Sequence, residues 1–267
     1  MAFQVSPGVN VSEIDLTTVV PAVSTTEGAI AGPFRWGPVG HRVLVSSEDE
    51  LVKRFQKPTN TNAETFFTAA NFLAYGNKLY VVRAARSANA TNIEAAYNAI
   101  GGGTITAMTN GRLGSGDTVV RIQNDESYEE DFINGVTGKD FEWAGRHPGA
   151  LGNSLQVSIC PAGGDSSGVH FDAWTYKSSF DGAPGTSAWA TARSASQDEV
   201  HVVVVDEDGL ISGTPGTVLE RFAFLSLASD AKTNDGSSNY ARDVINNTSA
   251  WVWLATFEGT LANLTGA

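Results

Sequence analysis

Two short runs in this sequence have residue types that could bind a phosphate or a metal ion. Gly101–Gly103 resembles a phosphate-binding loop, but no Lys-Ser/Thr pair follows it and no helical pattern begins there, although such loops require both. Asp206–Gly209 resembles a calcium loop, but the alternating ligands and closing glutamate of such a loop are missing. We therefore interpret the second run as a turn and expect no ligand at either one.

The histidines and serines show no catalytic spacing either. The four histidines share no metal-ligand spacing with one another or with Cys160; they are His41, His147, His170 and His201. No serine, including the one in the Gly-x-Ser-x-Gly run at 164–168, has the strand-turn-helix pattern around it that a hydrolase nucleophile elbow needs. The sequence therefore predicts no enzymatic activity, no metal and no cofactor.

The tryptophans leave a second class of function open. Trp174, Trp189, Trp251 and Trp253 lie in the half of the chain with strand patterns, and aromatic faces of this kind can stack on sugar rings. Aromatic residues in strands more often belong to a core, so we favour core packing. The alternative function is therefore a β-rich adhesin or carbohydrate-binding module.

Composition sets the broad class of the protein. The chain has 267 residues with 42% hydrophobic and 17% charged residues, which is typical of a globular protein. Its net charge of −12 argues against direct binding of nucleic acid, and no direct nucleic-acid contact is expected. Cys160 is the single cysteine, and its apolar neighbours predict a buried thiol. No pattern of a signal peptide or membrane span is present, so we expect cytoplasmic synthesis and no membrane insertion.

Residues 24–86 show an α/β pattern. Ser47-x-x-Glu50 and Thr61-x-x-Glu64 both have the form of a capping box, and each precedes an apolar helical face. Gly76 is expected to end the second helix in a left-handed conformation. Leu79–Arg83 is a continuous apolar run, which predicts a strand buried on both faces.

The later residues show mostly β patterns. Residues 87–140 are rich in turns and weakly patterned, whereas strands are expected around Leu155–Ile159, Phe171–Tyr176, His201–Val205 and Trp251–Leu254. Asp208-Gly209 predicts a hairpin turn, and 218–227 is ambiguous between helix and strand. We favour a strand there, with Val218, Phe222 and Phe224 on one face, and a short helix at 240–247. The predicted fold class is α+β, with a partial α/β sheet domain at 24–86 and an inserted, mostly β outer domain at 87–267.

The first 23 residues predict an extended N-terminal arm. Pro7 and Gly8 prevent a helix, and the apolar positions after them alternate with polar ones. Such an arm has too little apolar surface to fold alone, but it can add a strand to the sheet of a neighbouring subunit. We assign this inter-subunit strand to Val9, Val11, Glu13, Ile14 and Leu16. The alternative is a frayed terminus.

An ordered set of motifs resembles a known family. The motifs are Ser6–Asp15, Val20–Thr26, Gly32–Pro38, Leu51–Phe55, Phe72–Asn77, Leu79–Ala84, His147–Asn153 and Val202–Asp206. In this order they resemble the N-terminal portion of contractile tail sheath proteins of myovirus-type bacteriophages. Residues 90–140 match least. Sheath proteins are longer and carry a C-terminal portion that completes the α/β domain, so we expect this chain to be part of a longer subunit.

The resemblance implies a structural function. It implies a subunit that assembles in stacked hexameric rings around the tail tube and contracts, which drives the tube through the host envelope for DNA ejection. It also implies the tail tube protein and a baseplate or tail terminator as partners, a place in the virion, and assembly in the host cytoplasm. The resemblance assigns Trp36 to packing near a subunit contact.

Overall fold

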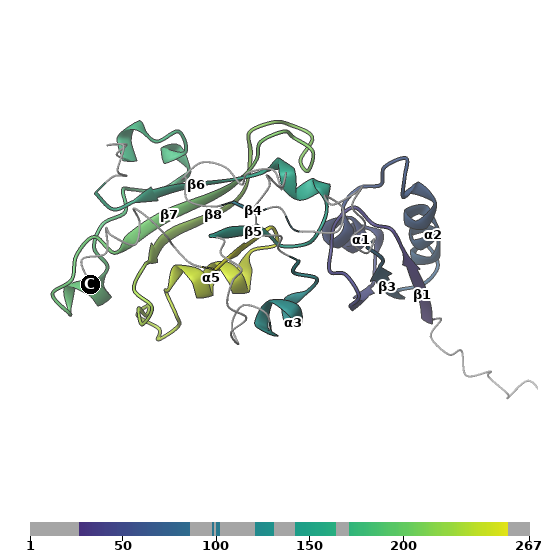
Figure 1. Cartoon of the computed structure of the whole chain (residues 1–267), viewed down its shortest axis with the longest axis horizontal. Coiled ribbons are helices and arrows are strands. Elements are labelled where there is room, and N and C mark those ends of the chain that lie inside the picture. The colour runs from purple at the N-terminus through teal and green to yellow at the C-terminus, as the bar shows by residue number, and fades with distance from the viewer. Residues whose placement is uncertain are drawn as a thin grey trace, which may run out of the picture.

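Three separate sheets organise the part of the chain that the computed structural model describes. This part comprises residues 27–85, 98, 100–101, 121–130, 142–163 and 171–255. One sheet lies with two helices at one end of an elongated molecule, and the other two sheets form the larger end (Figure 1). We call residues 27–85 the α/β unit and the described residues from 98 to 255 the β-rich unit. The mixed α+β class is confirmed, whereas the predicted domain bounds stay a prediction and the arm lies outside the described residues.

The α/β unit is a three-stranded sheet covered on one face by two helices. Its elements are β1 (Glu27–Gly32), β2 (Arg42–Val45), α1 (Glu48–Phe55), α2 (Ala63–Leu73) and β3 (Lys78–Arg83). The strand order is β1-β3-β2, with β1 parallel and β2 antiparallel to β3. Both helices pack on the sheet face that carries Val43, Val45, Leu79 and Val81, and Leu51, Phe55 and Phe66 close this core.

The start of α1 follows the predicted pattern in part. The Ser47 hydroxyl accepts a hydrogen bond from the Glu50 amide at 3.2 Å, which confirms the cap. The Glu50 carboxylate does not turn back to Ser47. It accepts instead from the amide and hydroxyl of Ser46, at 3.0 and 2.9 Å.

Two predictions about α2 are wrong. Asn62, and not Thr61, precedes the helix, and its side-chain oxygen accepts from the amide and hydroxyl of Thr59, so it stabilises the preceding turn. Gly76 does not have the left-handed backbone conformation that was expected. The helix α2 ends at Leu73, and its C-cap residue Ala74 is still right-handed. A Cβ at Gly76 would lie 3.0 Å from the Phe72 ring, so the small size of glycine is what this position uses.

The strand β3 is buried on one face in the described structure, and not on both. Leu79, Val81 and Arg83 are buried, whereas the alternating residues Lys78, Tyr80 and Val82 are only half-buried. The reason is that both helices lie on the same side of the sheet.

The β-rich unit contains two antiparallel sheets and short helices. The first sheet has the order β4 (Ile100–Gly101), β5 (Trp143–Gly145) and β9 (Val252–Leu254), and the second has the order β6 (Leu155–Pro161), β7 (Glu199–Asp206) and β8 (Thr217–Ser226). The α-helices are α3 (Asp125–Tyr128), α4 (Ala188–Thr191) and α5 (Ala241–Thr248), and the 3-10 helices are η3 (Ala150–Ser154), η4 (Phe171–Ala173) and η5 (Lys177–Ser179). The expected strands at 155–159, 201–205 and 251–254 and the short helix at 240–247 are thus confirmed.

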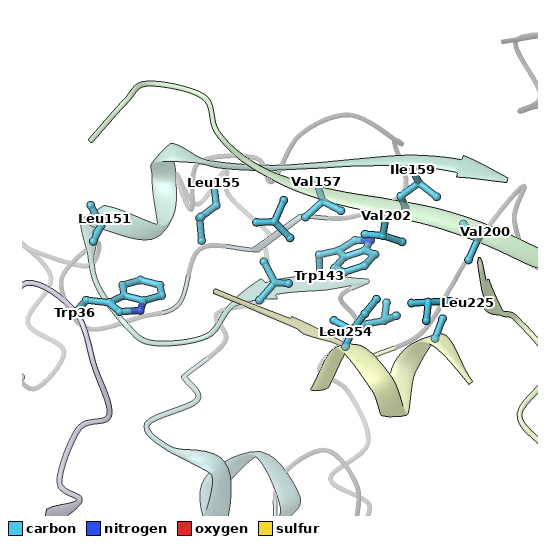
Figure 2. Packing of buried hydrophobic residues seen from close by; sticks show 14 residues of the cluster. Trp36, Trp143, Leu151, Leu155, Val157, Ile159, Val200, Val202, Leu225 and Leu254 are labelled. Carbon is cyan, nitrogen blue, oxygen red and sulfur yellow. The ribbon is translucent and has the colours of Figure 1, made fainter. Parts of the chain in front are cut away.

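The main core of this unit lies between its two sheets. Figure 2 shows Val157 and Ile159 of β6 and Val202 of β7 over Trp143 of β5 and Leu254 of β9. The strand β7 is buried on both faces, because its odd-numbered valines, 203 and 205, enter a second cluster with Cys160 and Trp174. The predictions of a buried Cys160 and of core positions for Trp174 and Trp253 are confirmed.

Two strand predictions for the β-rich unit need correction. The run from Phe171 to Tyr176 is not extended, because successive turns such as Trp174 N to Phe171 O fold it over the sheet. The segment 218–227 is a strand as predicted, but Val218 and Phe222 enter different clusters. Irregular pairing between β7 and β8, with Phe224 at a φ of 52°, breaks the alternation.

The predicted hairpin after β7 exists with a longer loop than expected. Gly209 has a φ of 73°, as a turn glycine should, but β8 begins only at Thr217. Asp206 holds this loop by accepting hydrogen bonds from Ser154 Oγ, Ile211 N and both the amide and hydroxyl of Ser212. The acidic run therefore forms a turn, as interpreted from the sequence.

Candidate functional site

The joint between the two units is built on Arg83, the last residue of β3. This side chain is buried, and its guanidinium donates to four backbone carbonyls. Nε bonds Phe34 O at 3.0 Å, Nη1 bonds Gly37 O at 2.7 Å, and Nη2 bonds Arg35 O at 3.5 Å and Pro148 O at 2.6 Å. Three of these carbonyls belong to the loop after β1 and the fourth to the β-rich unit. One side chain therefore fastens both units together.

Arginine suits this position because its planar fork carries five donors. Burial lowers the pKa of Arg83 to about 10, so the group is still charged at neutral pH. The converging carbonyl dipoles stabilise that charge. Gly149 has a φ of 136°, and a Cβ on it would lie 3.0 Å from Arg83 Nη2. The close approach of the backbone to Arg83 therefore requires glycine at 149.

Trp36 fastens the joint a second time. It comes from the loop after β1, is 2% exposed and belongs to the main core of the β-rich unit (Figure 2). Its ring lies 5.4 Å from that of Trp251 and 5.2 Å from that of His147, measured between centroids. The packing role expected for Trp36 is thus confirmed, and its nearness to a subunit contact stays a prediction.

Backbone hydrogen bonds add a third connection. Val39 N donates to Gln123 O at 2.9 Å, and Asn124 Nδ2 donates back to Val39 O at 3.2 Å. Gly40 N donates to Arg83 O at 3.3 Å. The loop at 34–40 is therefore hydrogen-bonded to Arg83 in the α/β unit and to Gln123 and Asn124 in the β-rich unit.

His147 lies at the joint without a hydrogen-bond partner for one of its nitrogens. Its Nδ1 is enclosed, and no described group bonds it. Burial and the neighbouring charges of Arg83 and Arg146 hold the pKa of His147 well below its usual value, so it is neutral at pH 7. His147 is therefore a packing residue with a titratable ring.

A groove of about 940 Å³ runs along the joint. The edge strand β2 and helix α1 line one side, and Asp125, Arg146 and Trp251 line the other. Arg146 stacks over Trp253 at 3.5 Å and pairs with Asp125 at 3.0 Å, while burial lowers its pKa. Across the groove, Glu50 pairs with Arg54 at 3.0 Å.

Within the described ranges, no three His, Cys, Asp or Glu side chains lie where they could hold a metal ion. His201 bonds Phe224 N at 3.1 Å through Nδ1 and Gly182 O at 2.9 Å through Nε2, so both its nitrogens serve packing. No helix that the structure describes is long and apolar enough to cross a membrane.

The residues assigned from the sequence to the inter-subunit strand lie outside the described residues; they are Val9, Val11, Glu13, Ile14 and Leu16. The structure brings together three other motifs of the resemblance. Gly32–Pro38, Leu79–Ala84 and His147–Asn153 meet at Arg83, although up to 65 residues separate the bonded atoms. The sequence analysis did not predict this joint. The signal that could have indicated it is Arg83, a charged residue at the end of an apolar strand.

Comparisons with known proteins agree with these motifs. Residues 28–84 match the family model described as the N-terminal region of domain III of the tail sheath protein Gp18. The tail sheath protein of Salmonella phage ViI is 30% identical over 235 residues, which cover 87% of this chain and 31% of that protein. The tail sheath proteins of Vibrio phage KVP40 and Enterobacteria phage T4 are 40% and 33% identical over 36% and 58% of this chain, and 14% and 25% of their own lengths.

A solved structure, the sheath tail protein Lin1278 from Listeria innocua, aligns over 89% of this chain and 32% of its own at 10% identity. Its TM-score of 0.37 is too low to carry an argument. The chain spans less than a third of the length of each of the three relatives above. The family model and these relatives confirm the resemblance, and this chain is a relative of phage tail sheath proteins.

Proposed function

We propose that this chain is part of a structural subunit of a contractile phage tail sheath. The match of residues 28–84 to a tail sheath domain carries the proposal. In it, subunits form stacked hexameric rings around a tail tube and contract to drive the tube through the host envelope for DNA ejection. The partners are further copies, the tube protein, and a baseplate or tail terminator. The subunit assembles in the host cytoplasm and resides in the virion.

The joint supports this proposal, because force transmission needs domains that move as rigid bodies. Arg83, Trp36 and the backbone bonds of Val39 connect the two units by three independent contacts. The proposal also requires no catalysis, metal or cofactor.

The alternative, a β-rich adhesin or carbohydrate-binding module, has less support. It needs exposed aromatic faces, but Trp174 and Trp253 are 7% and 3% exposed. Trp189 is only half-buried, but Arg193 lies over its ring at 3.2 Å. The tryptophans thus favour packing over a sugar platform.

Sedimentation and negative-stain microscopy of the full-length protein test the proposal. Rings or tubes are expected, and a monodisperse monomer that binds glycans would favour the alternative. Stoichiometric zinc or calcium in the purified protein would contradict the absence of a metal.

The arm provides a second test. Val11→Pro removes an amide donor and fixes φ, and Val9→Asp puts a charge on the face that the neighbour is expected to bury. Both variants should give soluble, folded subunits that form no rings or tubes. Normal polymerisation after deletion of residues 1–23 would refute the donated strand.

A further inference from the structure

One surface segment of the β-rich unit covers the outer face of β7. It runs from residue 171 through η4 and η5 to residue 182, and we call it the aromatic cover. Its aromatic side chains pack on the second cluster of this unit, which contains Cys160, Val203 and Val205. Trp174 is buried, whereas most residues between the aromatic side chains are exposed. The cover is therefore a thin layer over an apolar surface.

Two of the hydrogen bonds that hold the aromatic cover come from its own aromatic side chains. Trp174 Nε1 donates to Ser158 Oγ at 2.9 Å. Tyr176 OH donates to Gln156 Oε1 at 3.3 Å, which is longer than an ordinary hydrogen bond between two oxygens. Backbone bonds such as Trp174 N to Phe171 O form turns inside the cover and do not tie it to the sheet. A small number of contacts to the sheet therefore decides whether the cover stays closed.

His201 of β7 ties the end of the aromatic cover to strand β8. Its side chain is fully buried. A carbonyl oxygen can only accept, so Nε2 must carry the proton and donate to Gly182 O at 2.9 Å. Nδ1 then accepts from Phe224 N at 3.1 Å. These two partners require the neutral ring with its proton on Nε2.

The β8 side of this connection is the firmer one. Phe224 has a φ of 52° and lies where the pairing between β7 and β8 is irregular, and its amide there bonds His201. Its carbonyl accepts from Asn239 Nδ2 at 3.0 Å, and Ser226 N donates to Asn239 O at 2.9 Å. Strand β8 is also paired with β7 along its length. If the bonds of His201 fail, the aromatic cover is therefore the part that moves.

Protonation of His201 removes one of its two bonds. The added proton goes to Nδ1, so two N–H groups then face each other and the Phe224 amide loses its acceptor. The Phe180 ring lies parallel to the imidazole at 4.3 Å and attracts a cation, but this attraction does not replace the lost acceptor. Burial lowers the pKa of His201, which agrees with a cation that is disfavoured in the closed structure.

The charged groups near the aromatic cover do not compensate for a proton on His201. None of those described bonds His201, whose two partners are backbone atoms. Glu199 Oε2 accepts from Gly185 N at 2.9 Å. The titratable and charged side chains on this side of the sheet and in the cover are Cys160, Asp172, Lys177, Asp181, Glu199 and Arg221. The aspartates, the lysine and the arginine are exposed.

We propose that the aromatic cover is a lid that acid opens, because protonation of His201 releases it from β7. Opening exposes Cys160, Val203 and Val205 and leaves the main core closed, since Val202 and Val204 face the other sheet. In the open state His201 meets water and titrates near pH 6.5. Each opened cover therefore takes up a proton below that pH, and the open population rises as pH falls.

The reactivity of Cys160 in the full-length protein measures this opening. The reagent 4,4′-dithiodipyridine modifies thiols in acid as well as at neutral pH, and mass spectrometry of the peptide that contains Cys160 isolates its rate. That rate is divided by the rate of glutathione at the same pH. One histidine can raise the open population by up to about 30-fold between pH 7.5 and pH 5.0, so the ratio should rise by at least about fivefold. A smaller rise would overturn the proposal.

His201→Asn removes the titration and keeps an oxygen that can accept from the Phe224 amide. It loses the bond to Gly182 O, so Cys160 should react faster than in the wild type at pH 7.5, with a ratio that no longer depends on pH. His41→Asn is the matched control, because His41 is exposed, and it should keep the wild-type rise. A rise that persists in His201→Asn would show that another group controls the cover and would overturn the proposal.

Hydrogen exchange of the wild-type protein shows whether the opening is local. The amides of Trp174, Lys177 and Phe180, which bond within the cover, should lose protection at pH 5.0, whereas those of β6 and β7 should keep it. Equal loss in the cover and in both strands would mean global unfolding and would contradict the lid. The rise in Cys160 reactivity should also remain in His147→Phe, and its disappearance there would assign the acid effect to the joint instead.

Discussion

Replacing Arg83 with methionine should loosen the joint between the two units. Methionine keeps the length of the side chain and removes every donor. The Phe34, Gly37 and Pro148 carbonyls, which Arg83 bonds at 3.0 Å or less, then lose this donor inside the protein. The fourth bond, to Arg35 O at 3.5 Å, contributes little.

The size of the effect follows from two opposing quantities. A buried carbonyl that loses its partner costs about 1–3 kcal/mol, so three cost about 6 kcal/mol. Removal of a buried charge recovers part of this. The fall of the Arg83 pKa from 12.5 to about 10 corresponds to roughly 3 kcal/mol of burial penalty. The free energy of unfolding should therefore drop by about 3 kcal/mol.

Equilibrium unfolding in guanidinium chloride, followed by tryptophan fluorescence, measures this loss. Arg42→Met is the matched control, because Arg42 lies exposed on the neighbouring strand β2. Arg83→Lys should lose an intermediate amount, since one ammonium group cannot reach carbonyls that fan around a planar fork. If Arg83→Met costs no more than Arg42→Met, the joint does not depend on the guanidinium.

Three further changes test individual contacts. Gly149→Ala forces a Cβ to a φ of 136° beside Arg83 and should cost about 1–3 kcal/mol in the same unfolding assay, whereas Gly182→Ala, with open space around it, should cost little. Burial alone would raise the pKa of Asp206, but hydrogen bonds from Ser154, Ser212 and Ile211 outweigh it and lower that pKa. Asp206 therefore stabilises the fold above its unfolded pKa of about 3.9, and this stabilisation is lost as pH falls through the folded pKa. The variant Asp206→Asn should lower the free energy of unfolding by about 1–3 kcal/mol at pH 7 and by less at pH 3. An equal loss at both pH values would refute the argument. Burial depresses the pKa of His147, so stability should fall as pH drops below about 6.5, and unfolding at pH 7 and pH 5 should show a smaller difference in His147→Phe than in the wild type.

Local patterns predicted most elements, but not how many faces each strand buries. Leu79–Arg83 and His201–Val205 are both continuous apolar runs, and both are strands. The second is buried on both faces because aromatic side chains such as Trp174 and Phe180 cover the side opposite to the main core. The first has helices on one side only among the described residues. Which segments cover a strand is decided by tertiary packing, and a strand's own sequence does not contain that information.

The joint was harder to predict than the elements, because its partners are backbone atoms. The sequence identifies Arg83 as a basic residue after four apolar or aromatic ones, but carbonyl oxygens have no sequence signal. Gly149 and Trp36 are visible in the sequence, yet their roles depend on the loop after β1 reaching the β-rich core. The helix cap at Ser47 was predictable for the opposite reason, since all its atoms lie within four residues.

The strength of the joint bears on where a contracting assembly could move. Rotation of one unit against the other would break the Arg83 contacts, at about 3 kcal/mol from the argument above, and would expose Trp36. A tryptophan buries about 200 Å², which is worth about 5 kcal/mol at 25 cal/mol per Å². A rearrangement that costs about 8 kcal/mol in every subunit is populated less than once in 10⁵ molecules, by the relation of about 1.4 kcal/mol per tenfold. Contacts between copies join separate chains and can be exchanged without breaking the joint. The proposed change in packing on contraction is therefore expected between subunits, with the joint at Arg83 intact in both states.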